Sequence, residues 1–94
     1  MIVWTNQATQ QLDQAHDYIA LSSNWEMAAR VTMQIVAGIQ RLAAFPTSGR
    51  SGRVPGTREL AISNTPFVAA YAIEATRIVV LAIYRGVQRW PDVF

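Results

Sequence analysis

The chain has 94 residues, of which 51% are hydrophobic and 15% are charged. This length and composition predict one folded domain over residues 1–94 and exclude a disordered chain, because disorder goes with few apolar residues and many charges. The absence of cysteine excludes disulfides and Cys-type zinc sites, and the single histidine excludes a histidine-cluster metal site. We therefore expect no metal and no cofactor.

The charges are unevenly distributed along the chain. All eight cations are arginines; residues 1–29 carry a net charge of −3, and residues 30–94 carry +5. The later part of the chain could therefore face an anionic partner. The longest strongly apolar run, residues 78–84, is far shorter than the ~20 residues that span a bilayer, and the N-terminus lacks a signal-peptide pattern. We expect a cytoplasmic protein with no membrane partner.

The first half of the chain predicts a strand and two helices. Residues 2–4 (IVW) form a short strand, and Thr5 or Asn6 offers a helix N-cap. Two apolar stripes at helical spacing follow, on either side of a break at residues 22–24. The stripes are Ala8, Leu12, Ala15 and Ile19, and then Ala28, Thr32, Ile35, Ile39 and Leu42. Ser23 and Glu26 suggest a capping box for the second helix, which ends at Pro46. Two helices joined so closely form an antiparallel hairpin.

A glycine-rich loop and three strands make up the second half. Residues 45–57 (FPTSGRSGRVPGT) are long for a connection in so small a domain, which is typical of a functional loop. Residues 58–62, 67–73 and 78–84 read as strands separated by short turns, and hence as an antiparallel meander. The fold class is therefore α+β: a strand, a helix hairpin, and a three-stranded meander packed on the helices.

The short turns also predict the strand register. They pair Ile62 with Phe67, Leu60 with Ala69, Tyr71 with Val80, and Ile73 with Ile78. One face of the sheet then carries Leu60, Ile62, Phe67, Tyr71, Ile78 and Val80, and the other carries Val68, Ala70, Val79, Leu81 and Ile83. Both faces are apolar, and a helix hairpin covers only one. We expect a protein partner on the uncovered face, with the C-terminal tail or a homodimer as the alternatives.

The element order and several short motifs resemble the RelE/ParE superfamily of bacterial type II toxins. The matching segments are Trp4-Thr5 with Ala8, Ala28-Ala29, residues 49–60 (GRSGRVPGTREL), Thr65-Pro66-Phe67 with Tyr71, residues 78–81 (IVVL), and residues 86–91 (GVQRWP). The resemblance implies a toxin neutralised by a cognate antitoxin protein whose C-terminal segment wraps it. The assembly could be a homodimer or a toxin–antitoxin hetero-oligomer.

Two activities divide this superfamily: ParE-like members poison DNA gyrase, and RelE-like members cleave mRNA on the ribosome. Metal-free RNA cleavage needs a base, an acid and cations on the phosphate. By resemblance, Arg58 and Arg85 match arginines of the ribonucleases, and Tyr84 could take the catalytic tyrosine role. Trp90 stands where those enzymes have a tyrosine, and an indole lacks acid–base chemistry. The sequence therefore favours the ParE-like, non-enzymatic activity, with a ribonuclease or a degenerate partner-binding module as alternatives.

The candidate contacts for the target or antitoxin are all late in the chain: Arg50, Arg53, Arg58, Arg85, Arg89 and Trp90. Each arginine also has a structural interpretation. Arg50 and Arg53 could be solvated loop charges, and Arg58 or Glu59 could pair across the sheet. Arg58 and Glu59 are neighbours in a strand, so they should point to opposite faces. Arg85 and Arg89 could bind antitoxin carboxylates or anchor the chain end through Asp92.

Overall fold

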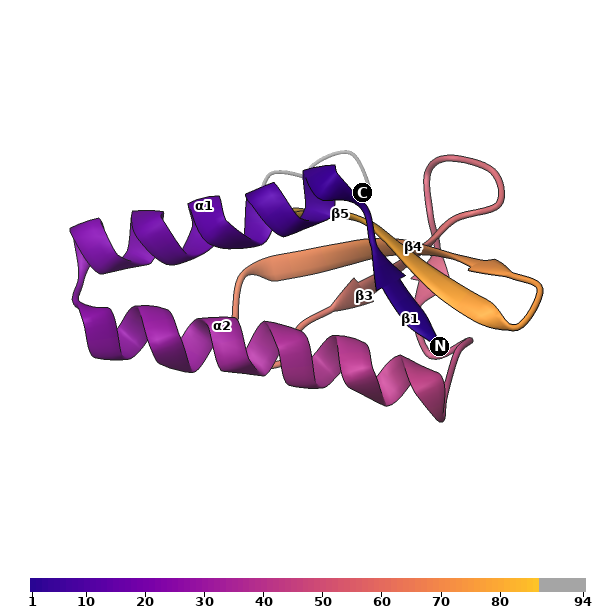
Figure 1. Cartoon of the computed structure of the whole chain (residues 1–94), viewed down its shortest axis with the longest axis horizontal. Helices are drawn as coiled ribbons and strands as arrows, with labels where there is room; N and C mark the ends of the chain where they lie inside the picture. Colours follow the sequence, from indigo (N-terminus) through magenta and orange to yellow (C-terminus); the bar gives the residue numbers. More distant parts are fainter. Residues whose placement is uncertain (87–94) are drawn as a thin grey trace, which may run out of the picture.

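The computed structural model describes residues 1–86. The elements are β1 (Ile2–Trp4), α1 (Asn6–Ser22), α2 (Trp25–Gln40), the 3-10 turn η1 (Arg41–Ala43), β2 (Arg50–Ser51), β3 (Arg58–Ala61), β4 (Phe67–Glu74) and β5 (Arg77–Arg85). Figure 1 shows the helix hairpin beside the sheet, with the closed end of the hairpin extending past it. The predicted α+β order of strand, helix hairpin and meander is confirmed. The strand β2, inside the glycine-rich loop, was not predicted.

The ends of the helices are capped by side chains. Thr5 is the N-cap of α1, where its hydroxyl accepts a hydrogen bond of 3.0 Å from the Ala8 N–H. The capping box predicted at Ser23 is wrong, because Asn24 is the N-cap of α2 and accepts a bond of 2.8 Å from the Met27 N–H. Ser23 instead closes α1 by donating its N–H to the Ile19 carbonyl. The α2 helix ends at Gln40 and η1 follows, so the helix stops before Pro46.

The five strands form one mixed sheet in the order β1-β5-β4-β3-β2. The meander strands β3, β4 and β5 are antiparallel, and β1 lies parallel to β5 at the edge of the sheet. The predicted pairs of Leu60 with Ala69, Tyr71 with Val80, and Ile73 with Ile78 are present. Ile62 and Phe67, the fourth predicted pair, are joined by a backbone hydrogen bond of 2.9 Å. The turn lengths were therefore sufficient to predict the register of the residues next to the turns.

A register shift in β5 corrects the predicted faces. Tyr71 pairs with Val80 but Ala70 pairs with Ala82, so Leu81 is an extra residue in β5. Such a bulge reverses the alternation of all the residues that follow it. Ile83 therefore lies on the helix-covered face, opposite Ala69, where only 3% of it is exposed. The expectation that Ile83 lies on the other face is wrong for this reason.

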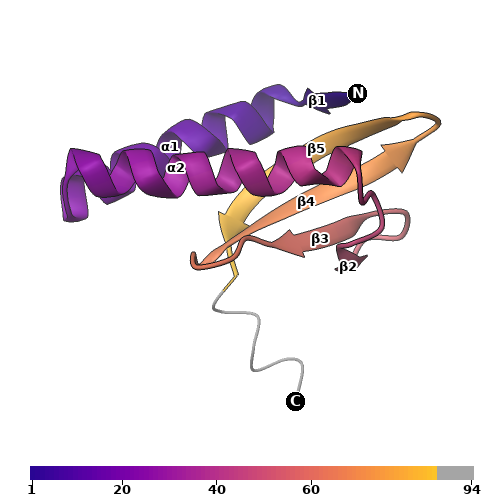
Figure 2. The ribbon, with the colours of Figure 1, turned by 90° about the horizontal axis from the view of Figure 1, so that it is seen from below.

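The helices cover one face of the sheet and build the core there (Figure 2). The core combines both predicted helical stripes with one face of the meander. Its buried members include Ala8, Ala15, Ile35, Ile39, Leu42, Ile62, Phe67, Tyr71, Ile78, Val80 and Ile83. Trp4, Leu12 and Ile19 are partly buried and pack against this cluster. None of the helices in residues 1–86 combines the length and apolarity needed to cross a membrane.

The helix-free face of the sheet is less bare than the sequence predicted. Val68 and Val79 on this face are only 6% and 9% exposed. These two strand residues therefore do not form a wide exposed apolar patch. Alanines at positions 70, 72 and 82 add little surface, because each carries a single methyl group. Beside them lies a hollow of about 530 Å³, which we call the trough. It is lined by Thr5, Gln7, Arg53, Val54, Thr57, Glu59, Ala70, Leu81, Ala82 and Tyr84.

Candidate functional site on the arginine-rich edge

Tyr71 and Arg58 fasten the start of the glycine-rich loop to the sheet. The buried Tyr71 hydroxyl donates to the Pro46 carbonyl at 2.7 Å and accepts from the Gly49 N–H at 3.0 Å. The Arg58 guanidinium donates from Nε to the Gly49 carbonyl at 2.9 Å and from Nη2 to the Thr47 carbonyl at 3.0 Å. These bonds satisfy backbone groups that a loop otherwise leaves to solvent. Arg58 thus has a structural role in positioning the loop.

Gly49 is required by this close approach. A Cβ placed on Gly49 would lie 2.7 Å from the Tyr71 hydroxyl and 2.8 Å from the Glu59 carbonyl oxygen. Both distances are too short for carbon, and one of the atoms belongs to the backbone and cannot turn away. The loop therefore crosses Tyr71 only because residue 49 has no side chain. This places β2 beside β3, with Arg50 opposite Glu59.

Glu59 is the only buried charged residue in the described part of the chain, at 7% exposure. It points to the helix-free side, since its partner Ala70 alternates with the core residues Ala69 and Tyr71. One carboxylate oxygen accepts a bond of 3.2 Å from Nη2 of Arg50, and the other accepts one of 3.4 Å from the Arg53 N–H. Glu59 therefore holds both arginine-bearing segments of the loop against the sheet.

Tyr84 completes this cluster at the trough. Burial, the negative charge of Glu59 and a hydrogen bond to Glu59 raise the pKa of the Tyr84 hydroxyl above its ordinary value, and the positive charges of Arg53 and Arg50 partly offset this. A raised pKa makes the phenolate rarer at neutral pH, so Tyr84 is a poor general base. Its neutral hydroxyl remains a hydrogen-bond donor.

Arg85 lies apart from the cluster, at the end of β5. Its guanidinium carbon stands 5.4 Å from the centre of the Tyr18 ring on α1, a cation–π contact. Both residues line a second hollow of about 250 Å³ between α1 and the end of β5. Arg85 therefore presents its charge beside the helix hairpin.

The predicted site residues thus divide into three groups. Arg50 and Arg53 lie with Glu59 and Tyr84 on the helix-free side, whereas Arg58 points to the opposite side, as predicted from its alternation with Glu59. Arg85 forms the third group, with Tyr18. Arg89 and Trp90 lie outside the described residues. The structure does not bring together Arg58, Tyr84 and Arg85, the set that RNA cleavage would use.

Sequence reasoning undervalued two members of this region, Glu59 and Tyr71. Tyr71 was assigned only to the apolar face, and nothing in a strand pattern indicates that a hydroxyl 22 residues away holds Gly49. Glu59 did carry a signal, because it is the only acidic residue between positions 27 and 73, a stretch that also contains five arginines. Pairing across the sheet was left open for it, and Arg50 is the partner.

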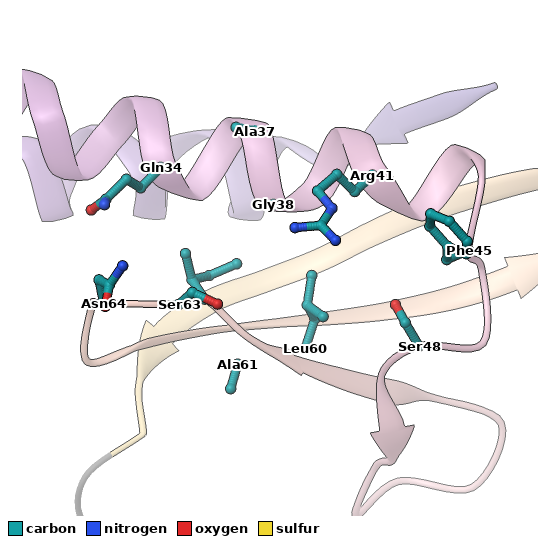
Figure 3. Close-up of a pocket in the computed structure, with 11 residues that line it drawn as sticks. Gln34, Ala37, Gly38, Arg41, Phe45, Ser48, Leu60, Ala61, Ser63 and Asn64 are labelled. Carbon is teal, nitrogen blue, oxygen red and sulfur yellow. The ribbon is translucent and has the colours of Figure 1, made fainter.

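A third hollow, which we call the groove, lies on the other side of the molecule, between α2 with η1 and the edge of β3. It has a volume of about 450 Å³. Its lining residues are Gln34, Ala37, Gly38, Arg41, Phe45, Ser48, Leu60, Ala61, Ile62, Ser63 and Asn64. Figure 3 shows the Arg41 side chain reaching from η1 toward the strand side. β2 pairs only with Arg58 and Glu59, so the edge of β3 beyond them has no partner strand in the described sheet.

Metal chemistry has no visible support in this region. Among residues 1–86, no three His, Asp or Glu side chains come together in an arrangement that could hold a metal ion. The described region offers arginine side chains, one buried carboxylate and shallow hollows.

Comparison with known proteins identifies the family. The family described as "ParE toxin of type II toxin-antitoxin system, parDE" matches residues 2–90. The Sinorhizobium fredii (strain NBRC 101917 / NGR234) protein named "Putative toxin Y4kP" is 36% identical over 92 residues, covering 98% of this chain and 94% of that protein. A solved structure titled "Chromosomal ParDE TA system from P. aeruginosa" superposes with a TM-score of 0.83 at 30% identity, covering 89% of this chain and 92% of its own. The chain therefore belongs to the ParE toxin family of type II toxin–antitoxin systems.

Proposed function

We propose that this ParE-family toxin acts by inhibiting DNA gyrase, and that a cognate antitoxin neutralises it by binding. The observation that weighs most against the ribonuclease alternative is the separation of Arg58, Tyr84 and Arg85. Arg58 donates two hydrogen bonds to backbone carbonyls, Tyr84 faces the helix-free side, and the Arg85 guanidinium lies over the Tyr18 ring. Acid–base cleavage needs such groups around one phosphate. A toxin that binds a protein target has no such requirement.

The experiment measures DNA synthesis and protein synthesis separately after expression of the chain is induced in bacterial cells. Gyrase inhibition predicts early loss of DNA synthesis with DNA-damage signalling, while protein synthesis continues. Immediate loss of translation with mRNA cuts in the ribosomal A site would instead establish the ribonuclease. An absence of any growth defect would favour the partner-binding module. A supercoiling assay with purified gyrase then tests the target directly.

Arg53 offers a matched pair of variants for that assay. Arg53 is exposed and lines the trough, and within residues 1–86 its guanidinium makes no ion pair. Arg77 is the control: it is also an exposed arginine beside a turn, but it pairs with Glu74 at 3.2 Å in the β4–β5 turn, away from the trough. If the trough contacts gyrase, Arg53→Gln weakens inhibition by about tenfold, the cost of one good charged contact, and Arg77→Gln leaves it unchanged.

The groove is the place that suits an antitoxin segment. Its floor is apolar at Leu60 and Ile62, and Gly38 leaves room above Ile62 because a Cβ there would lie only 3.1 Å from the Ile62 Cδ1. Arg41 at its rim makes no ion pair within residues 1–86. A segment with apolar side chains and a carboxylate would therefore match it in both shape and charge. We assign neutralisation to the groove and target contact to the trough.

A further inference from the structure

Glu59 is a carboxylate placed where an arginine-rich surface would otherwise receive an anion. Its side chain is only 8% exposed, and both of its oxygens are occupied. Its donors include Nη2 of Arg50, at 3.2 Å, and the N–H of Arg53, at 3.4 Å, beside the Tyr84 hydroxyl. A guanidinium and a backbone N–H on a loop are the donors that proteins commonly present to phosphate groups.

A phosphodiester approaching the trough would meet two obstacles. It carries the same charge and the same kind of acceptor oxygens as Glu59, so it would have to compete for donors that are already bonded. It would also be repelled by the Glu59 charge, which burial shields from screening by salt. Such repulsion at hydrogen-bonding range amounts to more than a factor of ten in binding at an effective dielectric constant of about 20.

We propose that Glu59 is a specificity-determining residue that closes the trough to phosphodiesters, by placing its own negative charge there and by occupying Nη2 of Arg50 and the Arg53 amide. The guanidinium of Arg53 then remains for a carboxylate of a protein partner. This inference rests on the proposed function, since it explains how a surface rich in arginine serves a protein target and discriminates against RNA.

The test measures binding of a fluorescein-labelled single-stranded RNA of about 12 nucleotides to the full chain, at about 50 mM salt. Glu59→Gln removes the charge at nearly constant volume and is expected to tighten RNA binding about tenfold and to steepen its salt dependence. Glu59→Asp keeps the charge and should show no gain. Glu74→Gln is the matched control, because it removes the same charge from an exposed ion pair in the β4–β5 turn. Equal RNA affinity of Glu59→Gln and Glu74→Gln would overturn the proposal.

A second measurement keeps the proposal testable if Glu59→Gln does not fold. Nη2 of Arg50 is already bonded to Glu59, so Arg50→Gln in the wild-type background should lower RNA affinity by less than about threefold; a larger loss would overturn the proposal. In the Glu59→Gln background the same substitution should remove most of the gain. The proposed function is judged separately, from DNA and protein synthesis with the wild-type chain. Gyrase inhibition without any RNA gain in Glu59→Gln would leave the function standing and the role of Glu59 refuted.

Discussion

Single side chains in this protein act mostly on the backbone of the glycine-rich loop. Tyr71 and Arg58 bond to backbone groups of residues 46–49, and Glu59 bonds to the backbone N–H of Arg53. The sequence supplied the residue types and their faces, but it did not indicate these partners. Strand alternation predicts which side of a sheet a residue occupies. The hydrogen-bond partner of its side chain, in contrast, depends on which distant loop packs against that side of the sheet.

The Tyr71 hydroxyl provides the first test at this scale. Tyr71→Phe leaves the buried Gly49 N–H and the Pro46 carbonyl without their partner, so we expect the free energy of unfolding to fall by about 2–3 kcal/mol. Chemical denaturation measures this loss. Tyr18→Phe is the control, because Tyr18 is 55% exposed and keeps its ring against Arg85, and its effect should stay within about 0.5 kcal/mol. A Tyr71→Phe protein as stable as Tyr18→Phe would show that the loop is not held by this hydroxyl.

Tyr84 predicts how stability depends on pH. Its pKa is raised in the folded state, by burial first and then by Glu59, so between the unfolded value of about 10 and the folded value the folded chain binds more protons. The contribution of the protonated Tyr84 hydroxyl to the free energy of unfolding is fully present below about pH 10 and is lost as the pH rises through the folded pKa of Tyr84. Denaturation from pH 9 to 11 should therefore show a smaller loss of stability for Tyr84→Phe than for the wild type. Parallel pH profiles of the two proteins would contradict the shift.

At the scale of elements, the turn between β4 and β5 stores local strain. Ala75 has φ of 51°, in the left-handed region that costs a residue with a Cβ about 1–2 kcal/mol. Ala75→Gly removes that cost and adds flexibility to the unfolded chain worth about 0.5–1 kcal/mol, so we expect a net gain of up to about 1 kcal/mol in stability. Thr76→Gly, at the neighbouring turn position without positive φ, should destabilise instead. Thermal unfolding of both variants decides it, and shifts of the same sign would contradict the assignment.

The bulge in β5 is the feature of the strands that the sequence pattern did not predict. β1 follows β5 only as far as the pair of Trp4 with Val80. Beyond it, side chains at the start of α1 bond to the edge of β5, because the Thr5 hydroxyl donates to the Leu81 carbonyl and the side-chain Oε1 of Gln11 accepts from the Ile83 N–H. The extra residue Leu81 lies at this changeover. These partners are 72 to 76 positions apart in the sequence, so no local pattern could place the bulge.

At the scale of the whole molecule, the trough and the groove lie on opposite sides of the sheet, and they should separate target binding from neutralisation. Arg41→Glu reverses the one charge at the rim of the groove, so we expect affinity for the antitoxin encoded with this toxin to fall by at least about tenfold while toxicity is retained. Growth of cells that co-express both proteins, together with binding of the purified pair, measures this. Arg77→Glu, in the distant β4–β5 turn, is the control and should be neutralised normally. An Arg41→Glu toxin that is silenced as well as this control would exclude the groove.

The sequence by itself determined the helices, the meander and its register next to the turns, and through its motifs the family. These features depend on helical spacing, alternation and turn length, which are local properties of the chain. The tertiary structure decided that β1 lies parallel to β5 and that Ile83 enters the core. It also decided that Arg50 forms an ion pair with Glu59, whereas Arg58 bonds to the backbone of the loop. The uneven distribution of charge pointed to an anionic partner for the later arginines. In the folded chain, some of these arginines bind groups of the protein itself: the Glu59 carboxylate binds Arg50, and the Gly49 carbonyl binds Arg58. The physical reason is that an arginine binds the carboxylate or carbonyl that three-dimensional packing brings nearest.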